Sequence, residues 1–351
     1  MNNIIKEDMN ILCHNDLDWE KFKDSTVLIT GAYGMLASYM VHTLMSLNEY
    51  YPKLHINVLA LCRDKEKAQV YFNAYRKHPL FHLIYGDVTV KETFSNLWHI
   101  DYIIHAASPA SSQFYTVNPT GVINANVYGT GNLLNLADEN KVKGFLFLSS
   151  GDVSGKITKE IFTENDYGPL DPTEIRSCYG ESKRMAENMC KCFNSEFNVK
   201  TMCVRPEHTY GPTMDLVNDH RVFAEFVSNI VNGKDIVIKS NGLAKRTFCY
   251  IADATDGFFR VLLNGKGGES YNVGNMGGRI SIGDLAESLV SLYPEKQLKV
   301  VYQPRTPDVN YIENKDNIRP TMSTEKIALL GYEPKYSVQE GFKRTVKSFI
   351  D

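Results

Sequence analysis

The chain has 351 residues, of which 43% are hydrophobic and 23% are charged. This composition is typical of a globular protein with one large domain or two unequal ones. Its formal net charge of −3 gives no electrostatic reason to bind nucleic acid. No apolar run reaches the roughly 18 residues of a membrane span, and MNNIIKEDMN lacks the order of a signal peptide. We therefore expect a cytoplasmic protein that binds neither nucleic acid nor membrane. The seven cysteines are scattered and odd in number, which favours reduced thiols, and no His or Cys spacing indicates a metal site.

Buried strands and helices alternate through the first half of the chain, after a polar leader at residues 1–24 with a short amphipathic helix at 16–22. Continuous apolar strands of this kind are typical of a parallel sheet that is covered on both faces. The fold class is therefore α/β, a Rossmann-type doubly wound sheet. The predicted strands are residues 26–30, 56–62, 82–88, 101–107, 144–150 and 199–206, and the clearest helices are residues 35–47 and 122–139.

The rhythm becomes irregular after residue 206, where Gly, Pro and Asn are frequent. A strand-like YNVG at 271–274 would return to the main sheet. We therefore predict two lobes that are discontinuous in sequence. Residues 1–205 and 250–277 would form a domain that binds NAD(P), and residues 206–249 and 278–351 would form a smaller substrate lobe.

The first predicted strand is followed by a dinucleotide fingerprint, TGAYGMLA. Gly31, Gly34 and Ala37 are small residues between a strand and a helix, where they let the backbone approach a pyrophosphate at the positive helix end. A plain tight turn is the alternative, but the preceding strand favours cofactor binding. Alanine in the third position is a variation that the fingerprint tolerates.

Charged residues follow the next two predicted strands. Arg63 could meet the 2′-phosphate of NADP, whereas Asp64 could bond the ribose hydroxyls of NAD, so the two cofactors are not distinguished here. Asp87 could contact the adenine ring or form an ordinary turn at the end of its strand.

Tyr179 and Lys183 in RSCYGESKRMAE lie four residues apart, on one face of a predicted helix. A nearby ammonium group favours the anion of a phenol, so Lys183 is expected to lower the pKa of Tyr179. Tyr179 could then act as a base in alcohol–ketone chemistry. A lone pair of this spacing is common on solvated helices, and the order of the other motifs gives it weight.

The motifs, in this order, resemble those of the extended short-chain dehydrogenase/reductases that modify nucleotide-activated sugars. TGAYGMLA is similar to the family's glycine turn, GDV to its adenine motif and HAASPAS to the loop beside the nicotinamide, which includes Ala106 and Ala107. NANVYGTGNLL, LSSGDVSG and CYGESK follow in the family's order. HAASPAS, RSCYGESKRMAE, NDHRVFAEF and RTFCYIADA most resemble UDP-glucuronate decarboxylases, with sugar epimerases and 4,6-dehydratases close behind.

The resemblance implies roles for individual residues. Ser150 would hydrogen-bond the substrate oxygen, Tyr179 would be the base, and Lys183 would hold the nicotinamide ribose. Arg221 and Arg246 would bind the diphosphate of the sugar nucleotide, for which a planar guanidinium is well suited.

Several positions depart from the family pattern, including Ser154, where the family has an aromatic residue. Gly151 and Asp152 replace the acidic pair of the dehydratases, so the acid that promotes elimination of water is missing. Asp152 would be the carboxylate that acts on a ketone formed when a substrate hydroxyl is oxidised. His208 replaces an asparagine that bonds a sugar phosphate. Arg319 is one residue away from the arginine expected before a proline, where it would recognise a substrate carboxylate.

Taken together, the sequence predicts an NAD(P)-dependent enzyme that acts on a nucleoside diphosphate sugar through a transient ketone and assembles as a homodimer. Decarboxylation and epimerisation are both open, with decarboxylation favoured by the resemblance. The alternatives are an NADPH-dependent ketoreductase of a keto sugar nucleotide and a non-catalytic protein that senses a dinucleotide.

Overall fold

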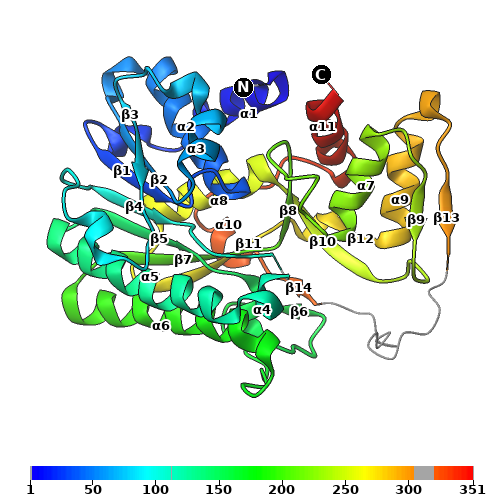
Figure 1. Cartoon of the computed structure of the whole chain (residues 1–351). Helices are drawn as coiled ribbons and strands as arrows, with labels where there is room; N and C mark the ends of the chain where they lie inside the picture. The colour runs from blue at the N-terminus through cyan, green and yellow to red at the C-terminus, as the bar shows by residue number, and fades with distance from the viewer. Residues whose placement is uncertain (1, 112, 304–319, 351) are drawn as a thin grey trace.

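A seven-stranded parallel sheet lies at the centre of the computed structural model, which describes residues 2–111, 113–303 and 320–350 (Figure 1). The strand order is β11-β7-β5-β4-β1-β2-β3, and every neighbouring pair is parallel. This arrangement confirms the predicted doubly wound α/β fold. The strands are β1 (Thr26–Thr30), β2 (Asn57–Cys62), β3 (Phe81–Tyr85), β4 (Tyr102–His105), β5 (Gly144–Leu148), β7 (Thr201–Pro206) and β11 (Glu269–Val273).

Helices cover both faces of this sheet because successive side chains of its strands point to opposite faces. Val27 and Ile29 of β1 pack in one hydrophobic cluster with α2 (Met35–Tyr50) and α8 (Ile251–Asn264). Leu28, between them, packs in a second cluster on the other face. That cluster includes side chains from α5 (Pro119–Asn140) and α6 (Cys178–Phe197). The short helix α3 (Lys65–Tyr71) connects β2 to β3.

The N-terminal segment differs from the polar leader that the sequence suggested. Residues Asn3–Cys13 form the helix α1, and residues 16–22 contain only a short 3₁₀ turn at Trp19–Phe22. The prediction failed because the apolar residues of α1 are interrupted by polar ones, one of which is itself buried. Asp8 is fully buried, where it accepts hydrogen bonds from Tyr250 (2.6 Å) and Arg344 (2.6 Å).

A second group of elements lies beside the carboxyl end of the main sheet, on the right of Figure 1. Its small sheets have the orders β12-β10-β8 and β13-β9. Its core is aromatic, and Tyr210 stacks on Phe342 with ring centroids 3.8 Å apart. The elements are β8 (His208–Tyr210), α7 (Val222–Val231), β9 (Ile236–Ile238), β10 (Lys245–Tyr250), β12 (Arg279–Ser281), α9 (Ile282–Ser291), β13 (Val300–Tyr302) and α11 (Val338–Ile350).

Two further short helices and a two-stranded pairing are also present in the described residues. β6 (Ile161–Phe162) pairs in parallel with β14 (Thr321–Met322), and α10 (Glu325–Ala328) follows β14. The helix α4 (Phe114–Val117) precedes α5.

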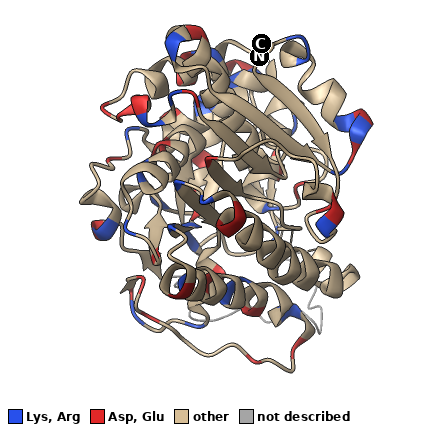
Figure 2. Cartoon of the chain, turned by 90° about the vertical axis from the view of Figure 1, so that its left-hand side faces the viewer, with Lys and Arg blue, Asp and Glu red and all other residues tan. Residues whose placement is uncertain are grey.

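The charged residues do not separate by sign along the ribbon in the view of Figure 2, where Lys and Arg are interspersed with Asp and Glu. Within the described ranges, no helix combines the length and the apolar character that crossing a membrane requires.

Candidate active site

The turn after β1 brings the backbone of two loops into close contact. Gly31 has a φ of +64°, and a Cβ atom at this position would lie 2.8 Å from the Cα of Ala107 and 3.2 Å from the carbonyl carbon of Ala106. Only glycine fits this conformation and this approach. Gly34 lies at the N-cap of α2, and Ala37 is buried in its first turn. The structure therefore unites Gly31, Gly34, Ala106 and Ala107 at a helix N-terminus that fits a pyrophosphate.

The loop at Ala106 and Ala107 is held by a polar group that the sequence did not indicate. The Thr30 hydroxyl accepts hydrogen bonds from the N–H groups of both alanines, each 3.2 Å long. It lies 2.9 Å from Nδ1 of His105, to which it donates its one proton. His105 therefore carries its own proton on Nε2. Burial and the charge of Lys183 lower the pKa of His105 to about 3, so the ring is neutral.

Two acidic residues near the next strands are engaged in local structure. Asp64 caps α3, where its Oδ1 accepts the N–H of Lys67 at 2.9 Å. Asp87 accepts the N–H and the hydroxyl of Thr89, at 2.9 and 2.8 Å. Arg63 approaches Asp87 at 3.8 Å. Burial opposes ionisation of Asp87, but the Thr89 bonds and Arg63 outweigh it and lower its pKa. The structure thus pairs Arg63 with Asp87 and places Asp64 at the helix start.

Ser150 and Tyr179 meet beyond the end of β5. Ser150 caps a 3₁₀ turn at Gly151–Ser154, and its hydroxyl accepts the N–H of Asp152 at 3.2 Å. Tyr179, in the first turn of α6, is 6% exposed and hydrogen-bonds with Ser150. Asp152 is exposed, and its charge raises the pKa of Tyr179. The carboxylate therefore lies close enough to the phenol to act on it electrostatically.

Lys183 lies one helical turn after Tyr179 and is buried. Its Nζ donates a hydrogen bond of 2.7 Å to the carbonyl of Leu148 and lies 5.8 Å from the centre of the Tyr179 ring. Burial lowers the pKa of Lys183 to about 7. Burial also raises the pKa of Tyr179 to about 12. The pKa of Tyr179 was expected to be lowered, but it is raised. The loss of hydration of the phenolate outweighs the attraction of nearby positive groups.

Three residues predicted to bind the substrate lie near the rings of Phe223 and Phe248. The His208 ring lies 5.9 Å from the ring of Phe248, and Arg246 shares a strand face with Phe248 because the two are two residues apart in β10. The guanidinium of Arg221 lies 4.6 Å from the ring centre of Phe223, which is 5.3 Å from that of Phe248.

Arg221 interacts electrostatically with Tyr179. Asp219 holds Arg221 through a hydrogen bond of 2.9 Å to its Nε. The positive charge of Arg221 also lowers the pKa of Tyr179, against the dominant effect of burial. The fourth predicted substrate residue, Arg319, lies outside the described residues.

Glu207, an acidic residue with a buried carboxyl oxygen at this edge of the sheet, was not singled out by the sequence analysis. It follows β7, which neighbours β5 at the same carboxyl edge of the sheet. Its carboxyl accepts hydrogen bonds from the N–H of Met322 and from Thr247. Among the residues that the structure describes, its buried Oε2 has no hydrogen-bond partner. Burial raises the pKa of Glu207 to about 8, so it is a neutral acid at pH 7. An acidic residue directly after a buried strand was the available signal.

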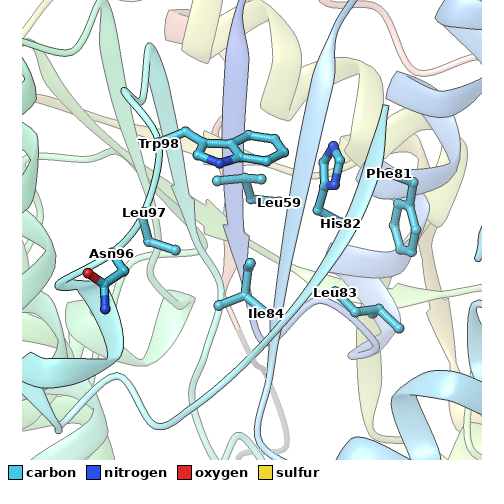
Figure 3. A pocket seen from close by; sticks show the side chains of 8 residues that line it. All are labelled: Leu59, Phe81, His82, Leu83, Ile84, Asn96, Leu97 and Trp98. Atoms are coloured by element: carbon cyan, nitrogen blue, oxygen red, sulfur yellow. The ribbon is translucent and has the colours of Figure 1, made fainter. Parts of the chain in front are cut away.

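A hollow in the described part of the chain lies away from these residues. It has a volume of about 380 Å³ and lies against β3, at the outer edge of the sheet (Figure 3). Trp98 and His82 meet there with ring centroids 4.3 Å apart. None of the predicted site residues lines this hollow. Its lining is formed by Leu59, Phe81, His82, Leu83, Ile84, Asn96, Leu97 and Trp98.

Known proteins resemble this chain both in sequence and in fold. The model of the NAD dependent epimerase/dehydratase family matches residues 27–274. UDP-glucuronic acid decarboxylase 6 of Arabidopsis thaliana is 32% identical over 324 residues, covering 92% of this chain and 88% of the relative. The dTDP-D-glucose 4,6-dehydratase of Mus musculus is 29% identical over 329 residues, covering 92% and 87%. The structure of UDP-glucose 4-epimerase from Thermotoga maritima superimposes with a TM-score of 0.77 at 23% identity, covering 92% and 98%.

Proposed function

Because the chain belongs to the NAD dependent epimerase/dehydratase family, we propose that it oxidises a ring hydroxyl of a nucleoside diphosphate sugar, acts on the ketone and then reduces it. Family membership makes it an NAD-dependent sugar-nucleotide enzyme. The proposal concerns the reaction, which we assign as decarboxylation, with epimerisation as the second candidate. The observation that carries the oxidation step is the meeting of Ser150, Tyr179 and Lys183 at the carboxyl end of β5. Decarboxylation is assigned from the similarity to UDP-glucuronic acid decarboxylases.

Each of these three side chains has a distinct role in the proposed first step. Tyr179 removes the hydroxyl proton, and Ser150 hydrogen-bonds the same substrate oxygen. Lys183 bonds the nicotinamide ribose. When bound, NAD supplies the hydride acceptor and, in its oxidised form, a positive charge. Since the pKa of Tyr179 is about 12, positive charge and donors must stabilise its phenolate before it can act near neutral pH. Arg221 and Ser150 already act in that direction.

The second step depends on what lies beside the ketone. Gly151 has no proton to donate, and Asp152 is an exposed carboxylate near Tyr179. A ketone makes a β-carboxylate labile and acidifies the neighbouring C–H bond. We therefore expect loss of carbon dioxide or proton exchange as the main outcome, and no elimination of water.

This expectation is tested by incubating the enzyme and NAD with UDP-glucuronic acid, UDP-glucose or dTDP-glucose in deuterated water. Mass spectrometry of the products should show loss of carbon dioxide from the glucuronic acid. Deuterium uptake without loss of mass would assign epimerisation. A 4-keto-6-deoxy product would contradict the expectation and would direct attention to Glu207, which is a neutral acid at this edge of the sheet.

The rival functions make different demands on the cofactor. An enzyme that cycles hydride internally retains NAD, whereas a ketoreductase exchanges NADPH at every turnover. Denaturing the purified protein and assaying the released dinucleotide distinguishes them. Cofactor binding without turnover of any sugar nucleotide would support the sensing protein.

A cytoplasmic homodimer is also part of the proposal, and light scattering on the purified protein tests the dimer.

Arg246→Ala is expected to weaken binding of free UDP much more than binding of NAD. A hydrogen bond to a charged group is worth about 1.5–3 kcal/mol, which corresponds to about a tenfold to hundredfold loss of affinity. Calorimetric titration of both ligands measures the two effects. Lys245→Ala is the matched control, because this adjacent cation lies on the opposite face of β10. Equal losses for UDP and NAD would remove Arg246 from the substrate site.

A further inference from the structure

Tyr115 and Tyr179 form a stacked pair of buried phenols. Tyr115 lies in α4, directly after the loop that contains Ala106 and Ala107. The two ring centroids are 4.6 Å apart with an interplanar angle of 14°, and the residues are 7% and 6% exposed. Their hydroxyl groups also form a hydrogen bond. Tyr115 therefore contacts the base itself.

The hydroxyl of Tyr115 has two acceptors for one proton. In the structure it donates a hydrogen bond of 2.9 Å to the carbonyl of Ala110. While Tyr179 is protonated, its own hydroxyl can donate to the oxygen of Tyr115. Once Tyr179 is a phenolate, the stronger acceptor is its charged oxygen. Ala110 is exposed, so water can bond its carbonyl when the Tyr115 hydroxyl turns away.

We propose that Tyr115 is a positioning residue for the base, whose hydroxyl turns from Ala110 to the Tyr179 oxygen and stabilises the phenolate. Tyr115 keeps its proton throughout, and the proton of the substrate hydroxyl goes to Tyr179. The inference rests on the proposed function, because it takes Tyr179 as the base. The stack fixes the direction of the Tyr179 ring, and the hydroxyl adds a donor that does not depend on the substrate.

Other groups around the two tyrosines also affect the ionisation of Tyr179, and they remain in place in a Tyr115 variant. Burial disfavours the phenolate of Tyr179 most strongly, and Asp152 also disfavours it, whereas Ser150 and Arg221 favour it. Lys183 lies 5.8 Å from the ring centre. Asp152 also opposes ionisation of Tyr115, and Arg176 favours it. The proposed effect of Tyr115 is thus a shift added to a fixed background.

Tyr115→Phe keeps the stacked ring and removes only the hydroxyl. We expect the rising limb of kcat/KM against pH, measured on the NAD-loaded enzyme with UDP-glucuronic acid, to move up by about one to two pH units. At higher pH the variant should approach the parent rate. Tyr128→Phe, at a tyrosine of α5 that is 64% exposed, is the control and should leave the profile unchanged.

An ultraviolet titration of the NAD-loaded protein gives the same information without turnover. The difference in absorbance between the parent and Tyr179→Phe isolates the ionisation of Tyr179. The same difference is then measured between Tyr115→Phe and the double variant that also carries Tyr179→Phe. We expect the isolated ionisation to shift to higher pH. An unchanged titration, or a uniform loss of activity without a shift in pH, overturns the inference. Tyr115→Met serves as a second variant without the hydroxyl if the first does not fold.

The two hypotheses fail in different ways. If Tyr179→Phe remains active, the base assignment of the proposed function is wrong and the inference falls with it. If Tyr179→Phe is inactive and Tyr115→Phe titrates like the parent, only the inference is wrong.

Discussion

Replacing Tyr179 by phenylalanine is expected to reduce kcat by about 10²–10⁴-fold, the usual contribution of a general base. The affinity for NAD should stay close to that of the parent, because the aromatic ring and its stack on Tyr115 remain. The change removes only the ionisable oxygen, which hydrogen-bonds with Ser150 and Tyr115. Steady-state kinetics with UDP-glucuronic acid and calorimetric titration of NAD measure the two quantities.

Tyr128→Phe again provides the control, because that hydroxyl lies on the exposed side of α5. A Tyr179→Phe enzyme within about tenfold of the parent would show that another group removes the proton. A parallel loss of NAD affinity would instead assign Tyr179 to cofactor binding.

Glu207→Gln is expected to change the pH dependence of stability. The pKa of Glu207 is about 8 in the folded protein, against a reference value of 4.5. Between these values the folded state keeps a proton that the unfolded state has lost. The free energy of unfolding therefore falls as pH rises through this window, by about 1.36 kcal/mol per pH unit. Glutamine has no proton to lose, so the variant should lack this part of the slope.

Thermal unfolding of the parent and the variant from pH 5 to pH 8 tests this prediction. The variant should match the parent near pH 5 and exceed its unfolding temperature increasingly toward pH 8. Glu295→Gln, at an exposed glutamate, is the control and should follow the parent curve. Parallel curves for Glu207→Gln and the parent would show that the carboxyl of Glu207 ionises as freely in the folded protein as in the unfolded one.

The sequence by itself determined the main sheet and the order of its motifs. Continuous apolar strands such as TVLIT and GFLFLSS have few alternatives to a sheet that is buried on both faces. The spacing of Gly31 and Gly34 after the first strand placed the glycine turn, and the four-residue interval placed Tyr179 and Lys183 on one helix face. These features are local, so a pattern over a few residues is sufficient to predict them.

Tertiary structure alone decided the environments of those side chains. The helix α1 escaped prediction because it buries Asp8, whose hydrogen-bond partners Tyr250 and Arg344 lie far along the chain. The pKa of Tyr179 depends on how much water its pocket excludes, a property that no helical spacing encodes. For the same reason Tyr115 and Glu207 were not recognised. Their environments arise only when loops and strands distant in sequence pack around them, since burial and hydrogen bonding are set by neighbours in space.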